Sequence, residues 1–424
     1  MGVRTRSAGV GRLRGRRKNK SSEETLASTA GPATIRDINR SILLNLIRTH
    51  QPVSRARLAV MTGMFRSTVS DIVKELISSR LLVEKAGKPE GRGRVPVLLS
   101  LNDRGFEVVG VSVRPEQTIV ALAGLTGRLG KAIVFPTPTD PNRLMSRLSA
   151  TIEKLRVQGG RPRGRTIEQI GVSVPGLVDA GAGRIRWLPH IPGYSDFDLA
   201  AALQKQFGIP AAIDNDANLA ALAEFSNGVA GQDPVQDFVF VEIGTEGVGG
   251  GVVLKGEIYR GHDKTLAGEF GHMVIEANGV ECGCGRKGCW EMYVSDRATL
   301  RRSQLHGSTG FESYGGFLEA ALNGDRSARA CLEETARYIA IGLTNIAFAL
   351  NPRAIVVAGR ICEAWPVVFP IIESAFSVAR LSLRVRKAML GANELFLQGA
   401  ILLALSRAFS QPVLGINAGD ATGG

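Results

Sequence analysis

Three of the five cysteines in this 424-residue chain lie close together, Cys282, Cys284 and Cys289, in the sequence CGCGRKGC. The glycines between them allow the backbone to turn tightly enough for the three sulfur atoms to converge. With His272, shortly before them, they supply three thiolates and one imidazole, the closed tetrahedral ligand set of a structural zinc site. The alternative is a glycine-rich loop with reduced, packed cysteines, but core cysteines behave as isolated small apolar residues. We therefore predict structural zinc at these four residues.

Two carboxylates, Glu269 and Glu291, are interleaved with these predicted ligands. A zinc ion that holds His272 by one ring nitrogen leaves the other nitrogen available for a second partner. Two carboxylates and an imidazole around one pocket suit a polyol, because each binds hydroxyl groups with fixed direction. The segment therefore predicts a site for a sugar beside the metal.

The net charge of +13 is concentrated at the start of the chain. Residues 1–100 hold 20 of the 52 lysines and arginines but 7 of the 39 aspartates and glutamates, so the remainder is neutral on balance. This asymmetry predicts an anionic partner for the N-terminal part alone. Residues 1–34 lack hydrophobic periodicity and are predicted to form a disordered basic tail.

A helix-turn-helix is predicted within residues 35–101. Apolar residues recur at helical spacing in three segments, Ser54 is placed to cap the second helix, and Gly63 lies in the turn before the third. Two strands at residues 83–84 and 97–100 then form a wing. We predict that the third helix and the wing contact DNA through Arg66, Ser67, Thr68, Ser70, Lys74, Arg92 and Arg94. A winged helix used for protein contacts is the alternative, and the local positive charge argues against it.

The rest of the chain has an α/β pattern. Strands are predicted at residues 108–113, 118–122, 131–135, 170–174, 238–243 and 354–358, and helices at 144–157, 219–225, 328–350, 365–379 and 394–408. No apolar run approaches the roughly 18 residues of a membrane span, and no apolar segment follows the basic N-terminus as in a signal peptide. Few cysteines suit a reducing compartment. We predict a cytoplasmic protein without a membrane partner, associated with the nucleoid when bound to DNA.

The run GEFGH followed by CGCGRKGCWE resembles the zinc and sugar-binding signature of the ROK family, which groups bacterial sugar-responsive repressors with sugar kinases. The segment from Ser54 to Glu84 is similar to the winged helix-turn-helix of ROK repressors, except that Phe65 stands where a small N-capping serine is usual. The resemblance implies a two-lobed actin-like (ribonuclease H-like) fold behind the winged helix. The expected domains are the tail 1–34, the winged helix 35–101, a first lobe 102–225 completed by helix 394–410, and a second lobe 226–393 with the zinc loop and a dimer surface.

The resemblance also implies a sugar-binding set, namely Asn215, Asp216, Glu269, His272 and Glu291. Asp216 matches the kinase base, and His190 stands where the family often has asparagine, so it either alters the choice of sugar or caps a loop. The first phosphate loop departs from the family, since Ser112 replaces its aspartate and Arg114, Pro115 and Glu116 replace Gly-Gly-Thr. Proline lacks an amide donor and glutamate repels phosphate. The second glycine-rich loop, 244–251, is largely intact, whereas Arg360 replaces a glycine near the expected adenosine site.

We therefore predict a sugar-responsive transcriptional regulator, a repressor, and no kinase activity, with Asp216 left as a vestigial base. Its expected partners are double-stranded operator DNA, a sugar effector and a second copy, as a homodimer or a dimer of dimers. Two alternatives stay open: a sugar kinase that retains a DNA-binding domain, and a constitutive DNA-binding protein with a vestigial sugar lobe. Sugar-dependent ATP turnover would distinguish the first, and the absence of any stabilising sugar would distinguish the second.

Overall fold

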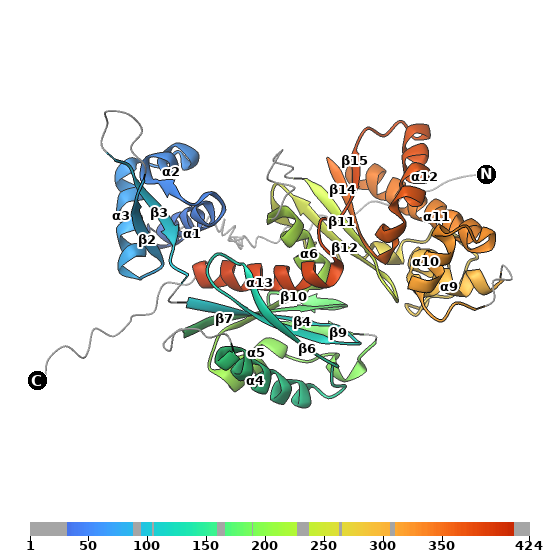
Figure 1. The fold of residues 1–424 in the computed structure, drawn as a ribbon, viewed down its shortest axis with the longest axis horizontal. Helices are drawn as coiled ribbons and strands as arrows, with labels where there is room; N and C mark the ends of the chain where they lie inside the picture. The colour runs from blue at the N-terminus through green and yellow to red at the C-terminus, as the bar shows by residue number, and fades with distance from the viewer. Residues whose placement is uncertain are drawn as a thin grey trace, which may run out of the picture.

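The computed structural model describes residues 32–87, 95–103, 106–158, 166–188, 190–226, 237–262, 265–305 and 310–410. Of the predicted tail at residues 1–34, residues 1–31 therefore lie outside the described residues. Arg92 and Arg94 of the predicted wing lie outside them as well. Three folded parts follow one another along the chain: a small helical part with a short sheet, and two lobes with a five-stranded sheet each (Figure 1).

The first part is a winged helix-turn-helix. Its elements are α1 (Pro32–His50), β1 (Val53–Ser54), α2 (Arg55–Thr62), α3 (Arg66–Ser78), β2 (Leu82–Ala86) and β3 (Val97–Leu101). The Ser54 side chain caps α2 by accepting a hydrogen bond from the Arg57 amide. Gly63 ends α2 in the left-handed conformation at φ +69°, and Phe65 precedes α3 without a side-chain cap. The expected N-terminal serine of α3 is thus absent, and the helix begins at Arg66.

The first lobe has a sheet in the order β10-β7-β4-β5-β6. Its strands are β4 (Phe106–Val113), β5 (Thr118–Ala123), β6 (Leu129–Phe135), β7 (Thr166–Val174) and β10 (Ala211–Asn215). β7 pairs parallel with both β4 and β10, whereas β4, β5 and β6 form an antiparallel meander. Helices α4 (Pro141–Gln158) and α5 (Leu199–Phe207) cover one face, beside a hairpin of β8 (Leu177–Asp179) and β9 (Arg184–Trp187).

The second lobe has a sheet in the order β13-β12-β11-β14-β15. Its strands are β11 (Phe238–Ile243), β12 (Val248–Leu254), β13 (Glu257–Ile258), β14 (Ala354–Gly359) and β15 (Arg384–Lys387). Its helices are α8 (Glu291–Val294), α9 (Asp296–Leu305), α10 (Tyr314–Leu322), α11 (Arg326–Leu350) and α12 (Trp365–Val378). Helix α6 (Asp216–Glu224) follows β10 and packs on β11 and β12, so it lies between the lobes.

Helix α13 (Ala392–Ser410) contacts all three parts (Figure 1). Near its start, Leu395 and Phe396 share a core with residues of β11 and β14. In its middle it lies directly on the first sheet, because a Cβ atom added at Gly171 would come 2.0 Å from the Ala400 carbonyl oxygen. Near its end, Leu405 and Phe409 pack in one core with α1, α2 and α3. One helix thus links the two lobes to the winged helix.

One described stretch, Arg360–Val378, is long and apolar enough to span a membrane by length and composition alone. About a third of it, 33%, is buried inside the structure. The inner face of α12, with Val368 and Ile372, packs in the second-lobe core against α11. This contact accounts for the apolar residues on that inner face.

Candidate functional site

The predicted metal ligands lie on one irregular segment of the second lobe. His272 ends the short 3-10 helix η3 (Phe270–His272), and Cys289 lies two residues before the start of α8. Backbone bridges join Val274 to Cys289 and Glu281 to Lys287, so the intervening loop folds back on itself. Gly288 is required here, because it has φ +74° and a Cβ atom would come 1.6 Å from the Glu276 carbonyl oxygen.

The buried Trp290 anchors this loop to the lobe. Its indole nitrogen donates a hydrogen bond of 2.8 Å to the Tyr338 carbonyl of α11, and its ring packs directly against Gly342. Because Trp290 lies between Cys289 and Glu291 in the sequence, this contact fixes one predicted metal ligand and one predicted sugar ligand together.

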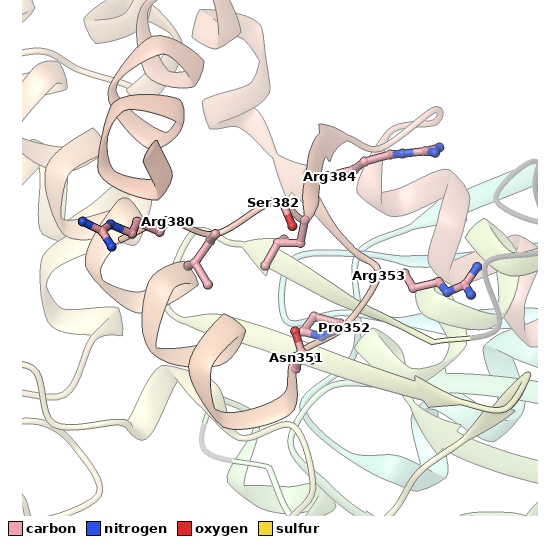
Figure 2. Close-up of a pocket in the computed structure, with 8 residues that line it drawn as sticks. Asn351, Pro352, Arg353, Arg380, Ser382 and Arg384 are labelled. Carbon is pink, nitrogen blue, oxygen red and sulfur yellow. The ribbon is translucent and has the colours of Figure 1, made fainter. Parts of the chain in front are cut away.

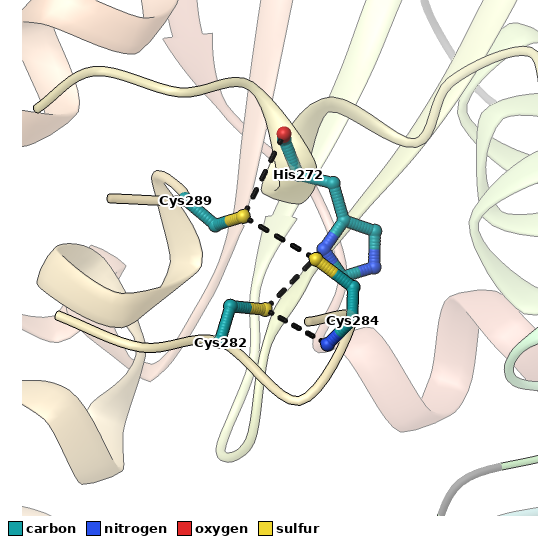
Figure 3. A group of neighbouring side chains, drawn as sticks. All are labelled: His272, Cys282, Cys284 and Cys289. Carbon is teal, nitrogen blue, oxygen red and sulfur yellow. Dashed lines mark hydrogen bonds between the residues drawn. The ribbon is translucent and has the colours of Figure 1, made fainter. Parts of the chain in front are cut away.

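The four predicted ligand atoms converge (Figure 3). The His272 nitrogen and the three cysteine sulfurs all lie within 4.8 Å of one another. The Cys284 and Cys289 sulfurs are 3.6 Å apart, and the Cys282 sulfur is 3.6 Å from Nδ1 of His272. All five cysteines of the chain are free thiols. A tetrahedron with zinc–sulfur bonds of about 2.3 Å places its sulfurs about 3.8 Å apart, so the spacing and the donor set both fit zinc.

The five predicted sugar-binding residues line one cavity of about 150 Å³ between the lobes. Asn215 ends β10 and Asp216 begins α6, whereas Glu269, His272 and Glu291 come from the second lobe. His190, whose role the sequence left open, also lines this cavity. Further lining residues include Arg114, Pro175, Trp187, Glu242 and the turn 244–249.

Asn215 is held in place from two sides. Its side-chain oxygen caps α6 by accepting from the Asn218 amide at 3.1 Å, and its side-chain nitrogen donates to the Gly176 carbonyl at 3.0 Å. Asn215 is therefore the N-cap of α6, and the Asp216 that follows it is the first residue of the helix. A neighbouring carboxylate, Asp214, is buried and pairs with Arg260 instead of facing the cavity.

Arg114 lines the cavity beside Asp216 and Glu242. It lies in the turn between β4 and β5, where its amide donates to the Gln117 carbonyl at 3.0 Å. Its guanidinium pairs with Asp216 and, at 3.4 Å, with Glu242 of β11, and it lies 4.6 Å above the Phe396 ring centroid of α13. Its side chain is only 17% exposed, so these contacts hold it in one place.

The carboxylates of the cavity are electrostatically unequal. Burial raises the pKa of Glu269 to about 7, an effect that His272 opposes and that Asp216 and Glu291 reinforce. Burial likewise raises the pKa of Glu242, against the opposing effect of Arg114. Glu269 therefore exchanges a proton close to neutral pH.

The sequence did not predict that Glu242 and Trp187 line the cavity. Glu242 is the single charged residue of an otherwise apolar strand, and its partner Arg114 is distant in the sequence. Trp187 ends a strand of the short β8–β9 hairpin, which no pattern had indicated. The one available signal was a charged residue in a fully buried strand, since such a residue requires a partner.

The predicted DNA-contacting residues of α3 lie on its solvent side. Arg66, Ser67 and Lys74 are exposed, whereas Thr68 and Ser70 are half-buried. Val69, Ile72, Val73 and Leu76 form the opposite, buried face. The wing residues Arg92 and Arg94 lie outside the described residues, so the structure does not place them.

A separate hollow of about 440 Å³ lies where α11 and α12 end near β15. It is lined by Asn351, Pro352, Arg353, Arg380, Leu381, Ser382, Leu383 and Arg384. The Arg380 side chain points one way and the Arg353 and Arg384 side chains another, so the three guanidinium groups do not converge on one ligand atom (Figure 2). The three arginines around this hollow therefore do not form a compact anion site.

The sequence profile of the ROK family matches residues 109–405, which include both lobes. The chain belongs to the ROK family. Among its ROK relatives, the xylose repressor of Bacillus spizizenii is 32% identical over 353 residues, 81% of this chain and 87% of that protein. The transcriptional dual regulator NagC of Escherichia coli is 27% identical over 355 residues, 82% of this chain and 86% of that protein.

Solved ROK structures support the same assignment. A ROK transcriptional regulator described as a homologue of the E. coli Mlc protein matches with a TM-score of 0.77 and 25% identity, covering 89% of this chain and 97% of that one. A ROK glucokinase from Streptomyces griseus, solved with glucose and AMPPNP, matches with a TM-score of 0.60 and 28% identity over 70% of this chain and 99% of that one. The predicted family, the fold class and the general interpretation as a sugar-responsive transcriptional regulator are confirmed.

Proposed function

We propose that this ROK protein is a transcriptional repressor whose affinity for operator DNA changes when a sugar binds between its lobes. The observation that carries the proposal is the position of α13. Phe396 near its start lies beneath Arg114 in the sugar cavity, and Phe409 near its end packs against the winged helix. A change at the cavity therefore has a direct physical route to the DNA-binding part.

The contacts at the far end of α13 are specific. The Phe409 carbonyl accepts hydrogen bonds from the Arg40 guanidinium and the Ser41 hydroxyl of α1, both at 3.2 Å. Arg40 is buried, and a buried hydrogen-bonded group resists independent movement of α1 and α13. A shift of α13 would therefore carry α1 with it and change how α3 is presented to DNA.

The sugar would be held by Asn215, Asp216, Glu269, His272 and Glu291. This set offers carboxylate acceptors, an amide and an imidazole within one small cavity. Asp216 already accepts from its neighbour's amide, Ala217, at 2.9 Å and pairs with Arg114. A sugar hydroxyl would thus bind to a carboxylate whose direction is fixed in advance. The ligand shifts the equilibrium only by its preference for one lobe arrangement.

Structural zinc would hold the loop that carries Glu291. The proposed ligands are His272, Cys282, Cys284 and Cys289, and a closed four-ligand site has no position for a substrate. Zinc would also fix the His272 ring, leaving its second nitrogen to face the sugar. The proposed role of the zinc is therefore structural: it would fix the loop and the His272 ring that shape the cavity.

Phosphoryl transfer is not proposed for this site. The guanidinium of Arg114 engages Asp216, which in a kinase would take the proton of the attacking hydroxyl. Pro115, next to it, has no amide hydrogen to offer a nucleotide phosphate. The ROK kinases among the structural relatives make sugar kinase activity the second candidate, and sugar-dependent ATP turnover would establish it.

DNA binding would use Arg66, Ser67, Thr68, Ser70 and Lys74 of α3, with Arg92 and Arg94 of the wing. The first turn of a recognition helix enters the major groove, and arginine is the residue best suited to guanine edges. Two winged helices in a homodimer would bind the two halves of a pseudo-palindromic operator. Light scattering of the purified chain, alone and with operator DNA, measures that stoichiometry.

A thermal-shift screen tests the proposed function. The full-length protein is heated with pentoses, hexoses, amino sugars and their phosphates, each with and without ATP. Stabilisation by a sugar irrespective of ATP supports a sensor, since a ligand that binds the folded state raises the melting temperature. Stabilisation by ATP, or turnover of ATP with a sugar, would instead support the kinase. Stabilisation by no compound would favour a constitutive DNA-binding protein.

A further inference from the structure

A second cavity, of about 290 Å³, adjoins the sugar cavity. The two share part of their lining: Trp187, His190, Glu246, Gly247, His272 and Glu291. The second cavity continues past the cysteine loop to α9, where Arg297 and Arg301 line it. A ligand that fills the first cavity can therefore extend directly into the second.

The first cavity has the size of a single sugar ring. A cavity of about 150 Å³ is known to take one benzene molecule, so the first cavity has room for about one six-membered ring and not for two. At the end away from the second cavity, Arg114 is fixed between Asp216, Glu242 and the Phe396 ring. None of these four residues lines the second cavity. A larger ligand therefore gains room on the side of Trp187 and α9.

The second cavity offers the two kinds of contact that a sugar ring uses. Trp187 supplies an aromatic surface and is 40% exposed, although large aromatic side chains usually bury most of their surface in the core. The carbon-bound hydrogens of a pyranose face pack well on such a ring. Arg301, exposed on α9, supplies donors for hydroxyl groups, since its guanidinium makes a long hydrogen bond of 3.4 Å to the Met292 carbonyl and keeps further N–H groups for a ligand.

An ion pair between α9 and the β11–β12 turn borders the second cavity. Arg297 of α9 pairs at 2.9 Å with Glu246, which lies in the turn between β11 and β12. Glu246 lines both cavities, whereas Arg297 lines the second cavity and not the first. The pair partly neutralises the cationic side chains of α9, so the second cavity suits a neutral ring better than a phosphate.

We propose that the second cavity is a subsite for a second sugar ring, so that the effector is a disaccharide or a longer oligosaccharide. One ring lies among Asn215, Glu269 and Glu291, and the next packs on Trp187 and reaches Arg301. The inference rests on the proposed function, since it assumes that the first cavity binds a sugar. It goes further by assigning the effector's length and the residues that select it.

Calorimetric titration of the full-length protein with matched sugars tests this. The pairs are xylose and xylobiose, glucose and cellobiose, and N-acetylglucosamine and chitobiose, in each of which the disaccharide adds one ring. For one pair we expect the disaccharide to bind about tenfold more tightly than its monosaccharide. Arg301→Ala should weaken binding of the disaccharide several-fold and leave binding of the monosaccharide unchanged, because Arg301 lines the second cavity and not the first. Trp187→Ala should weaken the disaccharide more than the monosaccharide.

Two exposed residues elsewhere provide matched controls. Tyr259→Ala removes an aromatic side chain that is 50% exposed, and Arg329→Ala removes an exposed arginine that pairs with Glu333 on α11. Neither should change the binding of any sugar.

The outcomes separate the inference from the proposed function. Binding of a monosaccharide as tight as that of its disaccharide, or equal loss of both in Arg301→Ala, overturns the second subsite and leaves the sugar sensor intact. Glucose 6-phosphate is titrated beside glucose. If it binds more tightly than any disaccharide and Arg301→Ala abolishes that binding, the second cavity binds a phosphate and the proposal is overturned. If no sugar of either length binds, the proposed function itself fails.

Discussion

The guanidinium of Arg114 pairs with the carboxylate of Asp216 inside the interlobe cavity, although the two residues are far apart in the sequence. The pair joins the β4–β5 turn to the start of α6, and Glu242 extends it to the second lobe. A residue at the position of a kinase's nucleotide loop thus pairs with the residue at the position of its catalytic base. This relationship underlies the proposal that the cavity binds a sugar without transferring phosphate.

Replacing Arg114 tests that connection. Arg114→Ala leaves Asp216 and Glu242 close together without their shared cation, and removing one partner of a buried ion pair costs about 3–5 kcal/mol. We expect a clearly lower melting temperature for Arg114→Ala in differential scanning calorimetry. Arg114→Ala combined with Glu242→Gln removes one charge of each sign and should recover part of the loss. Equal stability of the single variant and the wild type would contradict a structural role for the pair.

Metal content distinguishes zinc from packed cysteines. We expect about one zinc ion per chain in the purified protein by elemental analysis, since three thiolates and one imidazole complete a zinc site. Cys282→Ala should lose that zinc and lower the melting temperature, because the loop from η3 to α8 loses its cross-link. Cys331→Ala, at a buried cysteine away from the cluster, is the control and should keep the metal. Full zinc content in Cys282→Ala would show that the ligand assignment is wrong.

The affinity for the sugar should depend on pH through Glu269. Burial raises the pKa of its carboxyl group to about 7, so below neutral pH the free protein holds a proton there. If the carboxylate form accepts a sugar hydroxyl, binding releases that proton, and affinity falls as pH drops below about 7, by at most about tenfold per pH unit. Titrations between pH 5.5 and 8 check this, and Glu269→Gln should remove the dependence. An affinity that rises on acidification would contradict the assigned role.

DNA recognition should depend on the exposed face of α3. Arg66→Ala should cost about 1–3 kcal/mol of operator binding and relax specificity at one base pair, if Arg66 contacts a guanine. Lys74→Ala should weaken all sequences alike and reduce the salt dependence, as expected for a phosphate contact. Arg156→Ala, an exposed substitution on α4, is the control. Fluorescence anisotropy with operator and scrambled DNA separates these effects, and unchanged affinity in both α3 variants would argue for a winged helix used in protein contacts.

Much of the fold could be predicted because hydrophobic periodicity is a local property. The strand predicted at residues 238–243 is β11 (Phe238–Ile243), and the helix predicted at 328–350 is α11 with two more residues at its start. The cysteine loop was equally local, since its ligands and glycines are neighbours in sequence. The β8–β9 hairpin was missed because its strands are three and four residues long, too short for a recognisable pattern.

The cavity was only partly predictable because its ends are built from distant segments. Asn215, Glu269 and Glu291 lie in recognisable motifs, whereas Glu242 lies in an apolar strand and Trp187 ends a short one. Which cation would neutralise Glu242 depends on the packing of two lobes and α13, and no local pattern encodes that contact. The same holds for the hydrogen bonds from Arg40 and Ser41 to Phe409.

The most direct test of the central claim is a titration of operator DNA with the full-length protein, with and without the sugar that stabilises it. The DNA site is first selected by the protein from a random-sequence library, and binding is followed by fluorescence anisotropy at fixed salt. We predict that the sugar lowers operator affinity about tenfold or more, that ATP has no effect, and that Arg40→Met reduces the response without changing sugar affinity. Operator affinity that is the same at zero and saturating sugar would contradict the account.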